Sequence, residues 1–177
     1  MSSPLKEEDV WQYPRPPALE PVSQRLRVIW IAPDGVETTI ADTLSAYRVL
    51  ETSHPPTYYL SPEDCKTEFF TASMKSSFCE WKGRASYFDF HPPNQPDATV
   101  PARVWSYPNP TKGTKFGPIA NYLSFYADPG TDETKLGTWK CFVGDEQVRS
   151  QDGSFYGGWV TSNLKGRMKG GPGTWGW

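Results

Sequence analysis

Prolines and glycines interrupt this chain along its whole length. The 177 residues include 18 Pro and 15 Gly, beside an aromatic content of 15%. Proline fixes the backbone and removes an amide donor, and both residues favour turns, so long helices are disfavoured. Aromatic residues, in contrast, pack well on strands. We therefore expect a mostly β architecture, in which short strands are joined by many turns.

The length is that of one domain, and the composition divides it into a body with two arms. Residues 1–23 are expected to form a proline-rich N-terminal arm, because repeated prolines exclude a helix there. Residues 24–162 are expected to form a single β domain. Residues 163–177 are rich in glycine and are expected to form a C-terminal tail, either docked on the body or flexible.

Strand patterns recur through the body. The β-branched and aromatic stretch 25–31 and its return at 36–41 flank a Pro-Asp-Gly turn, which predicts a hairpin. Short helical turns are expected after Ser61, which precedes a proline, and over residues 116–121. Further strands are expected at 44–51, 57–60, 65–70, 84–90, 102–107, 122–127 and 139–143.

Charge and cysteine usage limit the possible partners and compartments. The net charge is −2 and no basic block occurs, so the sequence gives no nucleic-acid footprint. No secretory signal and no apolar stretch near the roughly 20 residues of a membrane span is visible, so no membrane contact is expected. Three widely spaced cysteines, Cys65, Cys79 and Cys141, argue against a disulfide framework. The expected location is cytoplasmic.

One short stretch concentrates groups that could do chemistry. Glu51-Thr-Ser-His54-Pro-Pro-Thr-Tyr58-Tyr59 combines a carboxylate, one of two histidines and two phenols. Two consecutive prolines restrict the backbone directly after the histidine, which is the one group there that titrates near neutral pH. This combination predicts a site that is held in place.

Two hypotheses fit Glu51 and His54. In the catalytic one, Glu51 orients the His54 imidazole, which acts as a general base towards a water or hydroxyl. In the structural one, Glu51 pairs with an arginine such as Arg48 or Arg84, and His54 hydrogen-bonds a turn carbonyl. Glu51 within hydrogen-bond reach of His54 at a pocket wall would favour the catalytic hypothesis.

Neighbouring residues extend the candidate site. Tyr58 and Tyr59 point to opposite faces of an extended chain, so at most one can line the same pocket as His54, and we assign Tyr59 to it. Cys79 is either a nucleophile partnered by His54 or an inert buried thiol. Lys82 is either an anion or oxyanion partner or a surface lysine.

Other motifs are ruled out by their context. No Gly-x-Ser-x-Gly elbow occurs, and helices do not alternate with strands, which excludes an α/β-hydrolase. The glycine pattern of residues 171–176 has no room for the helix that dinucleotide binding requires. Scattered histidines and cysteines give no recognised zinc spacing. No metal and no cofactor is therefore expected.

Several motifs together resemble one known family. They are Tyr47-Arg-Val-Leu-Glu-Thr-Ser-His54-Pro-Pro-Thr-Tyr-Tyr59, Cys79-Glu-Trp-Lys-Gly-Arg-Ala-Ser-Tyr87, Trp105-Ser-Tyr-Pro108 and Ile119-Ala-Asn-Tyr-Leu-Ser-Phe-Tyr126. Over residues 25–145 the chain resembles the family catalogued as domain of unknown function 427, in its longer single-copy form. The resemblance implies a β-tent, in which two antiparallel sheets meet at a steep angle. The family's recurrent residues correspond to Glu51, His54, Tyr59, Cys79, Lys82 and Trp105.

The resemblance also bears on cofactors and activity. Zinc-bearing β-tent relatives use four paired cysteines, which this chain lacks, so zinc is not expected here. The family is sometimes labelled nucleotidyltransferase, but no Gly-Ser with a following Asp-x-Asp is present. Nucleotidyl transfer is therefore a third expectation, which rests on the family label alone.

Residues and resemblance together predict a pocket for a small, partly apolar ligand. Its walls are expected from Trp81, Tyr87, Trp105, Tyr107 and Cys79. The first expectation is a slow hydrolase of small esters, with His54 as base and with Lys82 or the Tyr59 hydroxyl stabilising the oxyanion. The second is a non-catalytic module that binds a small molecule or a peptide end.

Overall fold

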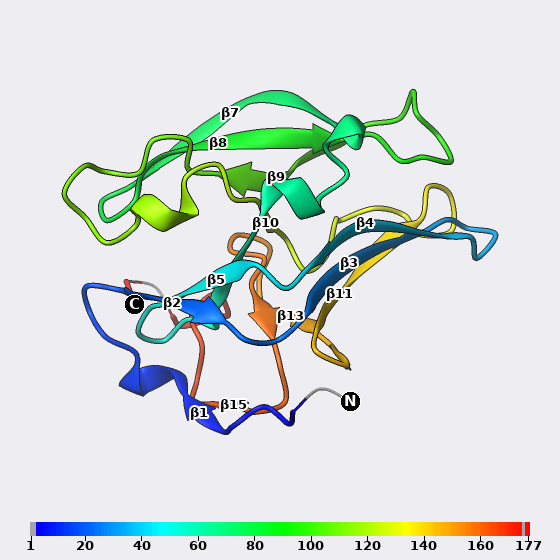
Figure 1. The fold of residues 1–177 in the computed structure, drawn as a ribbon. Coiled ribbons are helices and arrows are strands. Elements are labelled where there is room, and N and C mark those ends of the chain that lie inside the picture. Colours follow the sequence, from blue (N-terminus) through cyan, green and yellow to red (C-terminus); the bar gives the residue numbers. More distant parts are fainter. Residues whose placement is uncertain (1–2, 175) are drawn as a thin grey trace.

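Two four-stranded antiparallel sheets dominate the structure (Figure 1). The computed structural model describes residues 3–174 and 176–177, and the chain is mostly β, as predicted. The first sheet has the order β12-β11-β3-β4 and consists of β3 (Leu26–Ile31), β4 (Glu37–Thr43), β11 (Thr138–Val143) and β12 (Glu146–Gln147). The second has the order β10-β9-β8-β7 and consists of β7 (Phe70–Cys79), β8 (Gly83–Phe90), β9 (Val100–Ser106) and β10 (Ser124–Phe125).

Three smaller sheets complete the fold and include both predicted arms. One has the order β2-β5-β6, with β2 (Ala18–Val22), β5 (Ala46–Leu50) and β6 (Thr57–Leu60). A second pairs β13 (Arg149–Ser150) with β14 (Trp159–Val160), and a third pairs β1 (Glu8–Asp9) with β15 (Leu164–Lys165) in parallel. β1 and β15 lie together at the bottom of Figure 1, so the two ends of the chain are joined there by backbone pairing.

Short 3-10 turns are the helical elements of the described residues. The two that the sequence predicted are present at Pro62–Asp64 and Gly117–Ile119. Two more, Val10–Gln12 and Thr67–Phe69, were not predicted. No helix in the part of the chain that the structure describes is long and apolar enough to cross a membrane.

The strand predicted at 65–70 was wrong, and the polar strand that follows it was missed. Cys65 makes one isolated bridge to Ala41, after which the chain closes the turn Thr67–Phe69. β7 then begins at Phe70 and runs along the outer edge of its sheet, with most of its residues exposed. Backbone pairing with β8 forms this strand, so an alternating apolar pattern is not needed to specify it.

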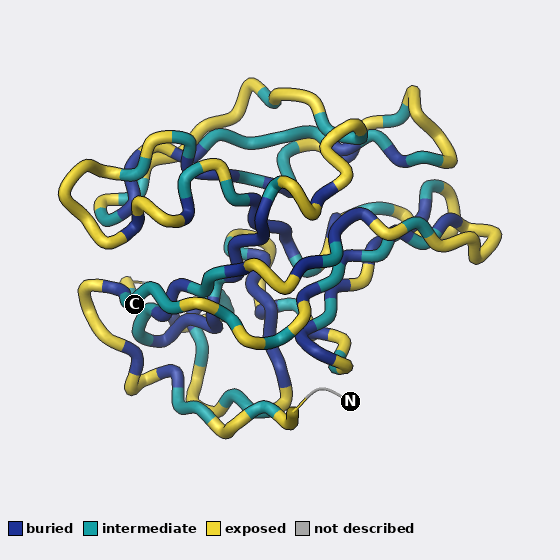
Figure 2. The backbone as a smooth tube through the Cα atoms, viewed as in Figure 1, coloured by how far each residue is buried: buried dark blue, intermediate teal, exposed yellow. Residues whose placement is uncertain are grey.

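The main core lies between the two larger sheets, in the buried interior that Figure 2 shows in dark blue. Aromatic rings from both sheets meet there. The ring centroids of Trp30 and Phe90 are 5.1 Å apart, those of Phe90 and Trp139 are 5.4 Å apart, and those of Phe125 and Trp139 are 5.8 Å apart. Tilted and edge-on ring pairs at these distances are favourable, so this cluster fixes how the two sheets pack.

Two buried indoles attach β10 to other sheets. Trp139 Nε1, on β11, donates to the Tyr126 carbonyl at 2.8 Å. Trp159 Nε1, on β14, donates to the adjacent Phe125 carbonyl, also at 2.8 Å. Since buried carbonyls must be satisfied, these two bonds tie three sheets together at consecutive residues.

The Trp159 bond can be tested through stability. Trp159→Phe leaves the buried Phe125 carbonyl without its donor, and we expect a loss of about 2–3 kcal/mol in the free energy of unfolding. Trp11→Phe is the matched control, because its indole also donates to a carbonyl but its side chain is 45% exposed. Urea unfolding of both variants should show the larger loss for Trp159→Phe, and equal losses would contradict the structural role.

Candidate functional site

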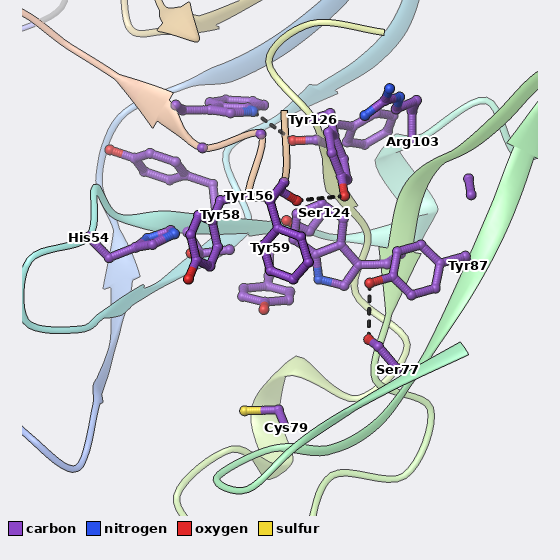
Figure 3. A pocket seen from close by; sticks show the side chains of 18 of the residues that line it. His54, Tyr58, Tyr59, Ser77, Cys79, Tyr87, Arg103, Ser124, Tyr126 and Tyr156 are labelled. Atoms are coloured by element: carbon purple, nitrogen blue, oxygen red, sulfur yellow. Dashed lines mark hydrogen bonds between the residues drawn. The ribbon is translucent and has the colours of Figure 1, made fainter. Parts of the chain in front are cut away.

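A cavity of about 770 Å³ brings most of the predicted site residues together. Its walls come from the sheet β10-β9-β8-β7, from residues 51–59 and from residues 154–159. In Figure 3, His54 lies at one side of the cavity and Tyr87 with Ser77 at the other. Of the predicted residues it contacts Glu51, His54, Tyr59, Cys79, Lys82, Tyr87, Trp105 and Tyr107. Trp81 does not line it and instead packs against the second core cluster.

The His54 ring is buried and held by its own turn. Its Nδ1 lies 2.6 Å from the Pro55 carbonyl, which only accepts, so Nδ1 carries the proton and Nε2 carries the lone pair. Among the described residues, no hydrogen bond reaches Nε2. The Tyr156 ring packs edge-on against the imidazole, at 5.3 Å between centroids.

Burial lowers the pKa of His54 from its usual 6.5 to about 4. The nearby ammonium groups of Lys169 and Lys82 lower this pKa further, while the Pro55 carbonyl and the Glu51 carboxylate act in the opposite direction. The imidazole is therefore neutral at pH 7, with an unprotonated Nε2. A base of such low pKa accepts protons weakly.

Glu51 does not orient His54 as the catalytic hypothesis required. Its Oε1 lies 3.4 Å from Lys169 Nζ, and no hydrogen bond joins its carboxylate to the imidazole among the described residues. The structural hypothesis is right about the turn carbonyl that holds His54 but wrong about the partner of Glu51. Arg48 pairs with Glu8 and Glu20 instead, and Arg84 donates to Ser76.

Lys82 is a buried lysine and not a surface one. Only 7% of it is exposed, and its Nζ lies 5.5 Å from the centroid of the Tyr107 ring and 5.9 Å from that of Phe116. The tight connection of β7 to β8 places it there, since Cys79 pairs with Gly83 and Gly83 has a φ of 98°. Among the described residues, no carboxylate lies within ion-pair distance of Lys82 Nζ.

Tyr58 and Tyr59 both reach the cavity, which corrects the prediction that only one could. The two side chains do point to opposite faces, because Tyr58 packs in the first core cluster and Tyr59 in the second. The cavity is large enough to touch both. Burial raises the pKa of Tyr59, and it raises the pKa of Tyr58 to about 12, so both phenols stay protonated at neutral pH.

The C-terminal part of the chain contributes residues that sequence reasoning missed. Lys169 is 6% exposed, with its Nζ 5.2 Å from the centroid of the Tyr156 ring. The side chain of Gln151 holds this region by donating to the Lys169 carbonyl at 2.6 Å and accepting from the Gly158 amide at 3.2 Å. The aromatic and glycine-rich run 155–159 was the available signal, but nothing in its pattern placed it beside His54.

Glycine is required where this run enters the cavity wall. Gly157 has a φ of 64°, and a Cβ there would lie 2.2 Å from the Tyr126 ring. A Cβ at Gly158 would lie 2.4 Å from Gln151 Oε1. The glycine pair thus lets the backbone pass close enough for Phe155 and Tyr156 to line the cavity.

The opposite wall is a row of aromatic rings in tilted and edge-on contact, with cations beside them. Tyr87 packs against Trp105 at 6.4 Å, and Trp105 meets Tyr126 edge-on at 5.4 Å. Lys75 Nζ lies 4.4 Å from the Tyr87 centroid, and the Arg103 guanidinium lies 4.7 Å from that of Tyr126. The cavity is therefore both aromatic and positively charged.

Comparison with known families now places the chain. A family model described as domain of unknown function 427 matches residues 18–136. This chain belongs to that family. The resemblance seen in the sequence is thereby confirmed, whereas no curated protein matches the chain. The match to family 427 includes Glu51, His54 and Lys82, while Tyr156 and Lys169 lie beyond it.

The described residues contain no set of side chains that could bind a metal ion. No group of three or more His, Cys, Asp or Glu side chains there could hold a metal ion. His91, the second histidine, is bonded to Thr71 and to the Ala98 carbonyl and does not line the cavity. The chemistry available in the cavity of this family 427 member is that of His54, Glu51, the lysines, Arg103, the phenols and Cys79.

The lowered pKa of His54 predicts a pH effect on stability. Between pH 6.5 and about 4 the unfolded chain binds the proton that the folded imidazole refuses, so stability falls as the pH drops through this range. The expected loss from this group is about 3 kcal/mol at pH 4. Urea unfolding at pH 7 and pH 4 should show a larger loss for the wild type than for His54→Gln. An identical pH dependence in the two proteins would contradict it.

Proposed function

We propose that this protein binds a small, partly aromatic molecule in the cavity beside His54. The observation that carries the proposal is the cavity itself, whose size lies within the range of ligand pockets and whose walls are rich in aromatic side chains. The rings that line it are Tyr58, Tyr59, Phe78, Tyr87, Trp105, Tyr107, Phe125, Tyr126, Phe155, Tyr156 and Trp159.

Two exposed apolar side chains that line the cavity indicate where a ligand would enter it. Phe78 and Phe155 both line the cavity while remaining largely exposed to solvent. Single exposed apolar side chains are common on folded surfaces, but exposed apolar groups that line a cavity are a feature of ligand-binding grooves. A planar ligand entering there would cover both rings and stack against the inner walls.

Binding can be measured with N-phenyl-1-naphthylamine, a neutral aromatic probe that fluoresces when it leaves water. The wild type is expected to bind it, and Tyr156→Ala to weaken binding about tenfold, because one wall ring is lost. Met74→Ala is the control, since Met74 is a fully exposed apolar side chain on β7 outside the cavity. Absence of binding to the wild type, or equal weakening by both variants, would overturn the proposal.

A second candidate is slow hydrolysis of a small ester bound in the same cavity. The supporting observation is the neutral His54, whose Nε2 lone pair is free of hydrogen bonds among the described residues. Nε2 would take a proton from water while the water oxygen bonds the ester carbonyl carbon. Lys82 or the Tyr59 hydroxyl would stabilise the oxyanion. The ester C–O bond then breaks, and His54 returns the proton to the leaving alcohol.

Small chromogenic esters test this candidate. His54→Ala is expected to lower the hydrolysis rate at least about a hundredfold, because the base is lost. Glu51→Gln is expected to keep most of the activity, because the Glu51 carboxylate contacts Lys169 and not the imidazole. Equal rates for all three proteins would exclude His54 as the base. Probe binding without any hydrolysis would leave the protein a non-catalytic binding module.

A reducing compartment such as the cytoplasm is part of the same proposal. The supporting observation is that Cys65, Cys79 and Cys141 are all free thiols, and that two of them are buried. Free cysteines are usual where thiols are kept reduced. Nucleotidyl transfer gains no comparable support, since the described residues offer no carboxylate cluster for a metal ion.

A further inference from the structure

We propose that the ligand is an aromatic anion, whose negatively charged group lies between Lys82 and Lys169 beside His54. This inference rests on the proposed binding function and names the class of ligand, an aromatic ring that carries a carboxylate, sulfonate or phosphate. Three features of the cavity support it: its charge balance, the missing carboxylate partner of Lys82, and the placement of both lysines in the cavity that His54 lines.

The charge balance of the cavity is positive. Among the described residues that line it, four side chains are cationic, namely Lys75, Lys82, Arg103 and Lys169, and one, Glu51, is anionic. The chain as a whole has a net charge of −2, so this excess is local. A concave site lined by one sign of charge attracts ligands of the other sign.

Among the described residues, Lys82 has no carboxylate partner, unlike the buried Lys169 and the half-buried Arg48. Arg48 is paired with Glu8 and Glu20, and Lys169 is paired with Glu51. Lys82 Nζ instead faces the rings of Tyr107 and Phe116, which attract a cation but carry no net charge. An ammonium group in a largely buried site is costly unless it is compensated. A ligand anion would supply the missing charge.

Lys82, Lys169 and His54 line the same cavity, although the two lysines come from segments far apart in the sequence. The Tyr156 ring lies beside both Lys169 and the imidazole, at 5.2 Å from Lys169 Nζ and at 5.3 Å from the His54 ring between centroids. Both ammonium groups also oppose the protonation of His54 and so lower its pKa. The Glu51 contact at 3.4 Å occupies only one direction of the Lys169 ammonium, which has three donors. An anion beside His54 would therefore receive hydrogen bonds from two ammonium groups, while its ring would stack on the aromatic walls.

The inference predicts discrimination between ligands that differ only in charge. By isothermal titration calorimetry, 1-naphthoate is expected to bind the wild type at least about tenfold more tightly than 1-naphthamide, its neutral analogue. Titration with 1-naphthyl phosphate shows whether the site prefers a carboxylate or a phosphate. Similar affinity for naphthoate and naphthamide would overturn the anion site and leave the binding function standing. No binding of any of the three ligands would overturn both.

Variants of Lys82 test whether this side chain causes the preference for the anionic ligand. Lys82→Met is expected to bring the affinity ratio of naphthoate to naphthamide close to one, while Lys82→Arg keeps most of the preference. Lys140→Met is the matched control, because Lys140 is exposed on β11 and outside the cavity, and it should leave the ratio unchanged. Retained binding of naphthamide shows that a variant is folded.

A second variant keeps the test decisive should Lys82→Met fail to fold. Lys169→Met removes the other ammonium and is expected to lower the same affinity ratio several-fold, because the anion loses one of its two donors. An unchanged ratio in Lys169→Met, or in a folded Lys82→Met, would overturn the assignment of the anion to this pair of lysines.

Discussion

The segment 123–127 is the point on which the rest of the structure depends. Leu123 bridges to Leu60 of β6, the Phe125 carbonyl accepts from the Trp159 indole, and the Tyr126 carbonyl accepts from the Trp139 indole. β10 itself pairs with β9. This segment of five residues thus connects four sheets, and the two indole hydrogen bonds are buried. Because buried donors and acceptors are costly to leave unpaired, the sheets cannot shift independently, and the cavity wall is fixed by the same bonds.

The cavity concentrates polar groups that a protein interior usually excludes. His54 avoids the cost of burial by staying neutral, and Lys169 does so by contacting Glu51. The Lys82 ammonium group lies beside two aromatic rings, and no carboxylate in the part of the chain that the structure describes pairs with it. Buried charges of this kind add little to the stability of the fold. They favour the binding of anions, because a bound group of opposite charge interacts more strongly with a lysine in a partly dry site than in water. Both the proposed binding and the proposed hydrolysis depend on these cationic groups in the cavity.

Much of the fold and part of the site could be predicted from the sequence. β-branched and aromatic residues on either side of a Pro-Asp-Gly turn identified the hairpin of β3 and β4, because such residues favour strands and such turns join them. The stretch from Glu51 to Tyr59 was identified as part of the site because its groups are neighbours along the chain. β7 was missed because pairing to β8 and not apolar periodicity specifies an edge strand. Trp81 was predicted to line the pocket as one of several nearby aromatic residues, but it is partly buried and packs against the second core cluster.

The sequence by itself determined a mostly β chain, its membership of family 427, and the pair Glu51 and His54 beside two prolines. Local patterns suffice for these features, since they depend on neighbouring residues. Only the tertiary structure decided that Glu51 contacts Lys169, and that Lys82 is buried with no carboxylate partner among the described residues. The Glu51–Lys169 contact joins residues 118 positions apart. No local pattern specifies which distant charge reaches a site, because that choice follows from how whole sheets pack.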